Sequence, residues 1–264
     1  MPTPITVIDA FTDRPFAGNP AGVCVLDQER PSEWLHAVAK ELNLSETAFL
    51  RRRADGDWDL RWFTPADEEQ LCGHATLASA HHLWQAGLHA ASAPLRFHTL
   101  SGVLTATRRD AAIVLDFPNE APRAIPVPSG LAEALSAPVR SAGQNRLDLF
   151  AELADEATVR ALAPAMDRVG AFDVRGVVVT ARADAGRPYD FVSRFFAPRC
   201  GIAEDPVTGS AHCGLGPWWS ERLGRATLRG YQASDRGGMV GVTVQGDRCL
   251  LEGTAVTVWK GELL

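Results

Sequence analysis

The sequence lacks the features by which several large classes of protein are recognised. It contains no apolar run of ~18 residues, so a membrane-spanning helix is not expected. Its net charge is −6, and no cluster of lysine and arginine is interleaved with aromatic residues, which argues against a nucleic-acid partner. The chain enters the strand-like segment 5–8 without a signal-peptide pattern, so we expect a cytoplasmic protein.

Cysteine is scarce and irregularly spaced. The 5 cysteines are Cys24, Cys72, Cys200, Cys213 and Cys249. Zinc sites and disulfide frameworks need paired or regularly spaced cysteines, and no C-x-x-C pair is present, so neither is expected and a reducing cytoplasm fits. His81 and His82 have no carboxylate or further histidine at ligand spacing on the same helix face. We therefore interpret both as structural residues and expect no metal site.

Sequence motifs for bound cofactors are also missing. There is neither a glycine-rich dinucleotide fingerprint nor a phosphate-binding loop, so no cofactor is expected. The sequence Gly209-Ser210-Ala211 lacks the second glycine of the Gly-x-Ser-x-Gly elbow of serine hydrolases. A nucleophilic role for Ser210 is therefore not favoured.

One motif occurs twice. Residues 61–65 read Arg-Trp-Phe-Thr-Pro and residues 194–198 read Arg-Phe-Phe-Ala-Pro. Each copy is followed by an acid-containing loop, a glycine (Gly73 or Gly209), one polar residue and a helix of small residues. Two equivalent halves of a chain usually fold as two similar domains, and facing domains make a cleft.

The pattern in each half is many short strands and one long apolar helix, predicted at 74–85 and at 210–223. A helix that is apolar nearly all round is buried, so the sheet of each half is expected to wrap around it. The proline-rich segment 118–128 is interpreted as the linker. The prediction is an α+β fold of two pseudo-symmetric domains, 1–117 and 118–264, each a mixed barrel-like sheet around a central helix. The return of the last strand to the first is left open.

The candidate site residues are polar groups that are expected to reach the cleft between the two halves. The proposed catalytic groups are Glu46, His74 and Asp205, and the proposed substrate-binding residues are Asn19, Gly73, Thr208, Gly209 and Ser210. A helix N-terminus has unsatisfied N–H groups and a partial positive charge, so it binds anions. The expected partner is thus a small carboxylate-bearing substrate, changed by acid–base chemistry between the two helix starts.

Simpler explanations exist for individual residues. Asp205 could only cap the second helix, as acidic residues before helices commonly do. Glu46 could be a charge at the protein surface, because glutamate is mostly exposed. Asn19 could be an ordinary turn residue.

Four ordered segments of the chain resemble the phenazine-biosynthesis PhzF-like proteins: 16–23, 43–49, 63–77 and 204–211. The resemblance implies the fold of diaminopimelate epimerase, with the site between two similar domains. It also implies a homodimer. The activity it implies is isomerisation of trans-2,3-dihydro-3-hydroxyanthranilate, in which a proton moves between carbons while a double bond shifts.

The resemblance assigns roles to individual residues. Glu46 corresponds to the family's proton-transferring glutamate, and His74, Asp205 and Ser210 correspond to its other polar site groups. Cys72 precedes the first central helix as one of the two catalytic cysteines of diaminopimelate epimerase does.

Two alternative functions remain open. One is an amino-acid epimerase or racemase that uses Cys72 or Glu46 together with Asp205. The second loop has no cysteine, and Cys213 lies about one turn into the helix, which disfavours a pair of thiolates. The other alternative is a non-catalytic binder of an acidic metabolite.

Overall fold

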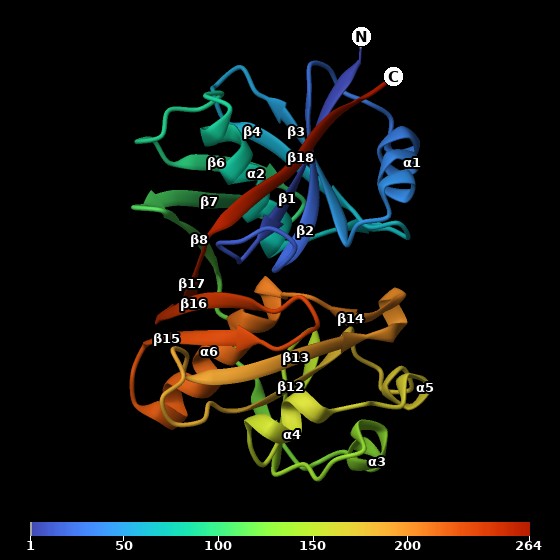
Figure 1. The fold of residues 1–264 in the computed structure, drawn as a ribbon, viewed down its shortest axis with the longest axis vertical. Helices are drawn as coiled ribbons and strands as arrows, with labels where there is room; N and C mark the ends of the chain where they lie inside the picture. Colours follow the sequence, from blue (N-terminus) through green and yellow to red (C-terminus); the bar gives the residue numbers. More distant parts are fainter. Residues whose placement is uncertain (1) are drawn as a thin grey trace. The chain divides into compact units, whose positions relative to one another are not determined.

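The computed structural model describes residues 2–264, which form two compact units (Figure 1). The first unit contains the described residues up to Phe117 together with Glu252–Leu264, and the second is Pro118–Leu251. The terminal residues belong to the first unit because the last strand pairs with the first. No helix within residues 2–264 is both long enough and apolar enough to span a membrane.

The first unit consists of nine strands and two helices among the described residues. These are β1 (Thr3–Ala10), β2 (Asn19–Leu26), α1 (Ser32–Leu42), β3 (Glu46–Arg52), β4 (Trp58–Phe63), β5 (Glu68–Glu69), α2 (Gly73–Gln85), β6 (Leu95–Thr99), β7 (Gly102–Arg109), β8 (Ala112–Pro118) and β18 (Ala255–Leu263).

The second unit has the same plan with more short helices. Its elements are β9 (Arg123–Ile125), α3 (Leu131–Leu135), β10 (Ser141–Gln144), β11 (Asp148–Glu152), α4 (Glu156–Ala161), α5 (Met166–Val169), β12 (Gly176–Arg182), β13 (Phe191–Ala197), the 3₁₀ turn η1 (Pro198–Cys200), β14 (Ile202–Asp205), α6 (Gly209–Leu223), β15 (Thr227–Gln232), β16 (Gly238–Gln245) and β17 (Arg248–Gly253).

The two sheets share one pairing pattern. In the first unit the strands pair in the order β18-β1-β2-β3-β4-β6-β7-β8, with β2–β3 and β4–β6 parallel and the other pairs antiparallel. In the second the order is β9-β10-β11-β12-β13-β15-β16, with β11–β12 and β13–β15 parallel. Parallel and antiparallel strand pairs thus follow one another in the same order in both units. The chain therefore contains the same mixed-sheet arrangement twice.

Each sheet packs around one buried helix. Along α2, ten of the thirteen residues are buried, and along α6 ten of fifteen are buried. Both helices therefore have almost no solvent-facing stripe, as expected for the centre of a unit. Close packing in α6 depends on glycine, because a Cβ atom at Gly214 would stand 2.4 Å from Phe150 Cζ.

Helix α6 continues through a proline. Pro217 has no N–H, so the carbonyl of Cys213 loses its helical partner. The backbone N–H of Glu120 donates to this carbonyl at 3.2 Å. The orphaned acceptor is thereby satisfied by the segment that enters the second unit, and the helix is not interrupted.

The repeated motif has a structural explanation. Arg61 on β4 makes a bidentate ion pair with Glu68 on β5, with both N–O distances 2.7 Å. Arg194 on β13 makes the same pair with Glu204 on β14, also at 2.7 Å. Each guanidinium also lies over the phenylalanine two residues later, at 5.0 and 4.9 Å. The arginine thus fastens the acidic loop to its strand just before the central helix begins.

Part of the predicted linker is a strand. Residues 123–125 form β9 and pair with β10, because Pro122 and Pro126 lie outside the three paired residues. The short strands β5 and β14 were not predicted from the sequence, and neither was the one-turn helix α5. Elements this short carry too little periodicity to be recognised.

Candidate active site

A glutamate–histidine pair lies at the N-terminus of α2. Glu46 is the first residue of β3, and its Oε2 lies 2.9 Å from Nε2 of His74, the second residue of α2. The side chains are 13% and 4% exposed, respectively. The interpretation of Glu46 as a surface charge is therefore wrong. Since little water reaches this contact, the interaction between the two groups is much stronger than between exposed side chains.

The other ring nitrogen of His74 is also in contact. Nδ2 of the fully buried Asn19 lies 3.1 Å from His74 Nδ1, and the sulfur of Cys72 lies 3.6 Å from it. An amide N–H at this position makes Nδ1 an acceptor and places the ring proton on Nε2, next to Glu46. Asn19 is thus a core residue that orients His74, rather than an ordinary turn residue.

Opposing effects set the protonation of His74. Burial lowers the pKa of His74, but the contacts with Cys72 and Glu46 outweigh burial and raise the pKa well above its ordinary value. With its Nδ2 facing His74 Nδ1, Asn19 disfavours a second proton on the ring. The opposite orientation of the amide would place Oδ1 there, which could accept a hydrogen bond from a protonated Nδ1.

Cys72 is the residue before α2 and is buried in the same cluster. The pKa of Cys72 is raised to about 11, mainly by burial and in addition by the charge of Glu46, although His74 and the backbone at Ala75 act in the opposite direction. A thiol with this pKa is protonated near neutral pH. Cys72 is consequently a poor thiolate base in this environment.

The start of α2 presents backbone donors. No side chain caps the helix at Cys72, and the first N–H groups of any helix have no partner within it. Gly73 and His74 are both buried there. The carbonyl of Cys72 is held by the Thr76 hydroxyl one turn along the helix. Glu46, His74, Asn19 and Gly73 thus form one centre in the first unit.

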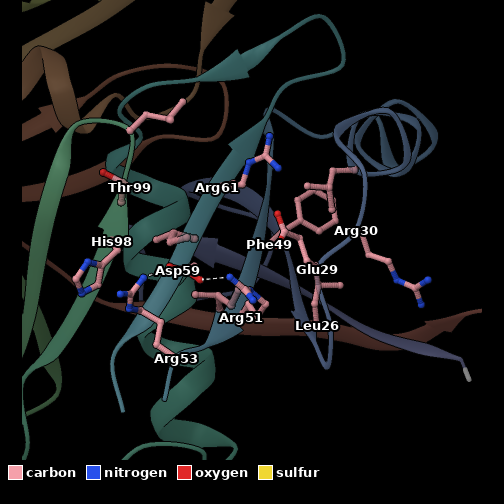
Figure 2. A pocket seen from close by; sticks show the side chains of 14 residues that line it. Leu26, Glu29, Arg30, Phe49, Arg51, Arg53, Asp59, Arg61, His98 and Thr99 are labelled. Atoms are coloured by element: carbon pink, nitrogen blue, oxygen red, sulfur yellow. Dashed lines mark hydrogen bonds and ion pairs between the residues drawn. The ribbon is translucent and has the colours of Figure 1, made fainter. Parts of the chain in front are cut away.

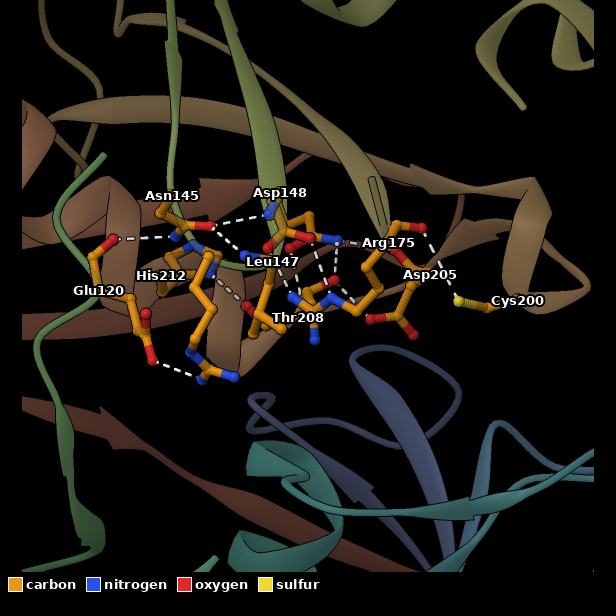
Figure 3. Close-up of polar contacts among 11 residues, drawn as sticks. Glu120, Asn145, Leu147, Asp148, Arg175, Cys200, Asp205, Thr208 and His212 are labelled. Atoms are coloured by element: carbon orange, nitrogen blue, oxygen red, sulfur yellow. Dashed lines mark hydrogen bonds and ion pairs between the residues drawn. The ribbon is translucent and has the colours of Figure 1, made fainter. Parts of the chain in front are cut away.

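Asp205, Thr208, Gly209 and Ser210 form a second centre, at the start of α6 in the second unit. Asp205 is the last residue of β14 and is buried, and its Oδ2 accepts a hydrogen bond from the Thr208 hydroxyl (Figure 3). Thr208, not Asp205, is the residue that precedes the helix, and no side chain caps it. The interpretation of Asp205 as only a helix cap is therefore wrong. Ser210 lies buried in the first turn.

Gln232 belongs to this centre but was not predicted from the sequence. It is the last residue of β15 and is 1% exposed. Its Oε1 accepts from the Thr208 N–H at 2.9 Å, and its Nε2 donates to the Asp205 carbonyl at 2.7 Å. Strand alternation places Leu228, Gly230 and Gln232 on one buried face. A polar amide at a position that this pattern predicts to be buried could have indicated the role of Gln232 from the sequence.

Potential metal ligands occur in the first unit. Ligand atoms of Glu46, Cys72 and His74 lie within 4.8 Å of one another. Glu46 contacts Nε2 of the ring while Cys72 approaches Nδ1, so the two face different edges of the imidazole. A second group, Asp55, Asp57 and His98, is already engaged by Arg53 and Arg96. The expectation of no metal stays a prediction.

A separate hollow of about 260 Å³ lies in the first unit, beside β3 and β4 (Figure 2). Its walls include Phe49 and Leu60, and arginines stand at its rim. Arg51 and Arg53 both contact Asp59 at 2.7 Å, and Arg61 is held by Glu68. Because these three guanidinium groups already have carboxylate partners, we assign no substrate to this hollow.

The buried ring of His212 should make the free energy of unfolding depend on pH. Burial lowers the pKa of His212 to about 4, opposed by its contact with the Thr208 carbonyl. The unfolded chain binds a proton near pH 6.5, so stability from the neutral ring is complete above that pH. It is lost as the pH falls toward 4, by roughly 3 kcal/mol for a difference of about 2.5 pKa units.

In His212→Leu the free energy of unfolding should therefore fall less between pH 7 and pH 4.5 than in the wild type, measured by urea denaturation at each pH. Parallel pH profiles for the two proteins would contradict the assignment.

Comparisons with known proteins agree with this architecture. The family model described as phenazine biosynthesis-like protein, PhzC-PhzF, matches residues 8–261. An uncharacterized isomerase of Halalkalibacterium halodurans is 49% identical over 100% of this chain and 99% of its own. A PhzF family crystal structure from Enterococcus faecalis is 42% identical, with a TM-score of 0.95 and full coverage of both chains.

A predicted epimerase from Pseudomonas aeruginosa, 21% identical with a TM-score of 0.73 over 99% of each chain, has the same fold. The predicted epimerase-like α+β fold is confirmed. On the full-length family match and these identities, the chain belongs to the PhzC-PhzF family of phenazine biosynthesis-like proteins.

Proposed function

We propose that the protein is an isomerase that moves a proton between carbons of a small carboxylate-bearing substrate, with Glu46 carrying the proton. The observation that carries the proposal is the 2.9 Å contact between Glu46 Oε2 and His74 Nε2 in a largely buried centre. Membership of the family and the description of relatives as isomerases support this reaction class.

The reaction balances without a further reagent. Glu46 removes a proton from a substrate carbon, and the electron pair of the broken C–H bond enters the double-bond system, which shifts. The carboxylic acid so formed exchanges its proton with solvent and then donates a proton to another carbon, which regenerates the carboxylate. Oε2 of Glu46 faces His74 Nε2 at 2.9 Å, so we assign Oε1, the other carboxylate oxygen, to the substrate proton.

The substrate carboxylate is assigned to the N-terminus of α2. The N–H groups of Gly73 and His74 are at the helix start, where an anion is favoured by unsatisfied donors and by the helix dipole. Asp205, Thr208, Gly209 and Ser210 are proposed, from the sequence, to act on the same substrate molecule. We take trans-2,3-dihydro-3-hydroxyanthranilate as the first probe because the proposed chemistry is a proton transfer with a double-bond shift.

The amino-acid epimerase is less well supported. A thiolate base requires Cys72 to lose its proton, whereas burial raises the pKa of Cys72 to about 11. The centre instead provides a carboxylate, a better base at neutral pH than a buried thiol.

The proposal is tested by following product structure with NMR. The probe and a panel of L-amino acids are each incubated with the wild type and with Cys72→Ser. We expect a double-bond shift in the probe with both proteins and no inversion of any amino acid. Inversion that disappears in Cys72→Ser would favour the epimerase, and tight binding of the probe without conversion would favour a binding protein.

A further inference from the structure

Thr208 is held at each of its polar groups by a buried partner. Its N–H donates to Gln232 Oε1 at 2.9 Å, and its carbonyl accepts from Nδ1 of His212 at 2.8 Å. Its hydroxyl donates to Asp205 Oδ2. All three partners and Thr208 itself are buried (Figure 3 shows Asp205, Thr208 and His212). Thr208, which donates to the Asp205 carboxylate, is therefore held by three separate side chains.

The segment after β15 also holds the loop around Asp205. Nε2 of Gln232 donates to the Asp205 carbonyl at 2.7 Å and lies 3.2 Å from the Thr208 hydroxyl. The Ser234 hydroxyl donates to the Pro206 carbonyl at 2.8 Å. The chain from Asp205 to Thr208 is thus fastened by side chains from a neighbouring strand end, in addition to its own helix.

The first unit provides an internal comparison. Cys72 precedes α2 as Thr208 precedes α6, and four residues later Thr76 and His212 occupy equivalent positions. The Thr76 hydroxyl donates to the Cys72 carbonyl, and the His212 ring donates to the Thr208 carbonyl. Both units therefore use a buried side chain to hold the carbonyl that precedes the central helix.

The second unit uses a histidine where a threonine would make the same bond. Nε2 of His212 is buried and makes no hydrogen bond to any residue from 2 to 264. A buried nitrogen without a partner is costly, so its presence needs an explanation. The ring lies 5.9 Å from the Phe191 ring, and a Cβ atom on Gly230 would be 3.0 Å from Nε2. The imidazole thus both fills the space beneath β15 and anchors the Thr208 carbonyl.

We propose that His212 and Gln232 are positioning residues, which act through Thr208 to hold the Asp205 carboxylate in one place. The catalytic consequence rests on the proposed function, in which Asp205 contacts the substrate. The structural part does not: the two residues hold the segment 205–208 whether or not the chain is an isomerase.

The chain itself suggests two opposite substitutions of His212 and one of Gln232. His212→Thr copies the first unit, because it keeps a donor for the Thr208 carbonyl and removes the ring. His212→Leu keeps most of the volume and removes the donor. Gln232→Met removes the amide contacts to Asp205 and Thr208 with a side chain of similar shape. If these residues act only by packing, the exchange rates of the variants should follow their loss of stability. If they position Thr208, the exchange rates should follow the loss of the hydrogen bonds to the segment 205–208.

The test is amide hydrogen exchange of the full chain, followed by mass spectrometry in peptides covering 205–212. We expect exchange to be faster in His212→Leu and Gln232→Met, by up to about tenfold for each hydrogen bond that is lost. His212→Thr should exchange like the wild type although it has the lowest melting temperature of the His212 variants. Exchange that instead follows melting temperature, with His212→Thr fastest, would overturn the proposal.

Turnover separates this inference from the proposed function. With the probe substrate, His212→Leu and Gln232→Met should lower kcat on the order of 10- to 100-fold with little change in KM, and His212→Thr should keep most of the activity. If Asp205→Asn has wild-type turnover while the exchange results hold, the positioning is correct and the assigned role of Asp205 is wrong. If Asp205→Asn is inactive and His212→Leu has normal exchange and kcat, the positioning is wrong.

Discussion

Glu46→Gln lowers turnover of the probe by a factor on the order of 10² to 10⁴, the range that a positioned general acid–base contributes. The amide is nearly the same shape as the carboxylate and still reaches His74 Nε2, but it cannot accept a proton from carbon. The effect should therefore fall on kcat, while KM changes little. The measurement is steady-state kinetics by ultraviolet absorbance.

The matched control is Glu41→Gln, at an exposed glutamate of α1, which should leave kcat unchanged. An independent readout is the titration of His74 by NMR. The carboxylate is one of the groups that raise the pKa of His74, so that pKa should fall in Glu46→Gln. Wild-type kcat in Glu46→Gln would remove this residue from the chemistry.

His74→Phe is expected to lower kcat on the order of 100-fold, because Glu46 loses the electrostatic contact between its Oε2 and His74 Nε2 at 2.9 Å, which orients the carboxylate. The ring is 4% exposed, so the phenyl group can occupy similar space, and the loss should come from orientation rather than from unfolding. Steady-state kinetics and a melting curve of each variant are the required measurements.

His74→Gln is the paired variant. Its carboxamide can place an N–H near the position of Nε2, so it should recover part of the activity that His74→Phe loses. Equal loss in both variants at equal stability would show that His74 does more than orient Glu46. Full activity in His74→Phe would exclude it from the mechanism.

The sequence predicted the features that depend on long patterns. The two central helices are visible as apolar segments with few charges, and the repeated Arg-x-Phe-x-Pro motif indicated two related halves. The helices found at Gly73–Gln85 and Gly209–Leu223 start within one residue of the predicted positions. The epimerase-like fold followed from this repeat together with the family resemblance.

Contacts that depend on the register between two strands were not predictable. The acid that pairs with Arg61 depends on the register of β4 with β5, in which Phe63 faces Glu68. That register is set by a two-residue strand without periodicity. Glu204, the partner of Arg194, could not be predicted for the same reason, although both acid-containing loops were recognised in the sequence.

In the candidate site, too, residue types were predictable from the sequence and contacts between residues were not. Glu46 and His74 could be nominated from their motifs, but their 2.9 Å contact requires β2 and β3 to pair in parallel, with Ala21 opposite Glu46. Gln232 was missed because its role depends on where β15 ends, next to Asp205 and Thr208. Residue types near helix starts are readable from sequence, whereas the groups that orient them come from other strands.

The most direct test of proton transfer by Glu46 is isomerisation of the probe in ²H₂O, with the label located by NMR in the product. Because the Glu46 carboxylic acid exchanges its proton with ²H₂O before it donates to carbon, we expect deuterium at the carbon that receives the proton with the wild type. With Glu46→Gln we expect neither label nor isomerised product within the time of the wild-type reaction. Formation of product that carries deuterium at that carbon, at the wild-type rate in Glu46→Gln, would contradict proton transfer by Glu46.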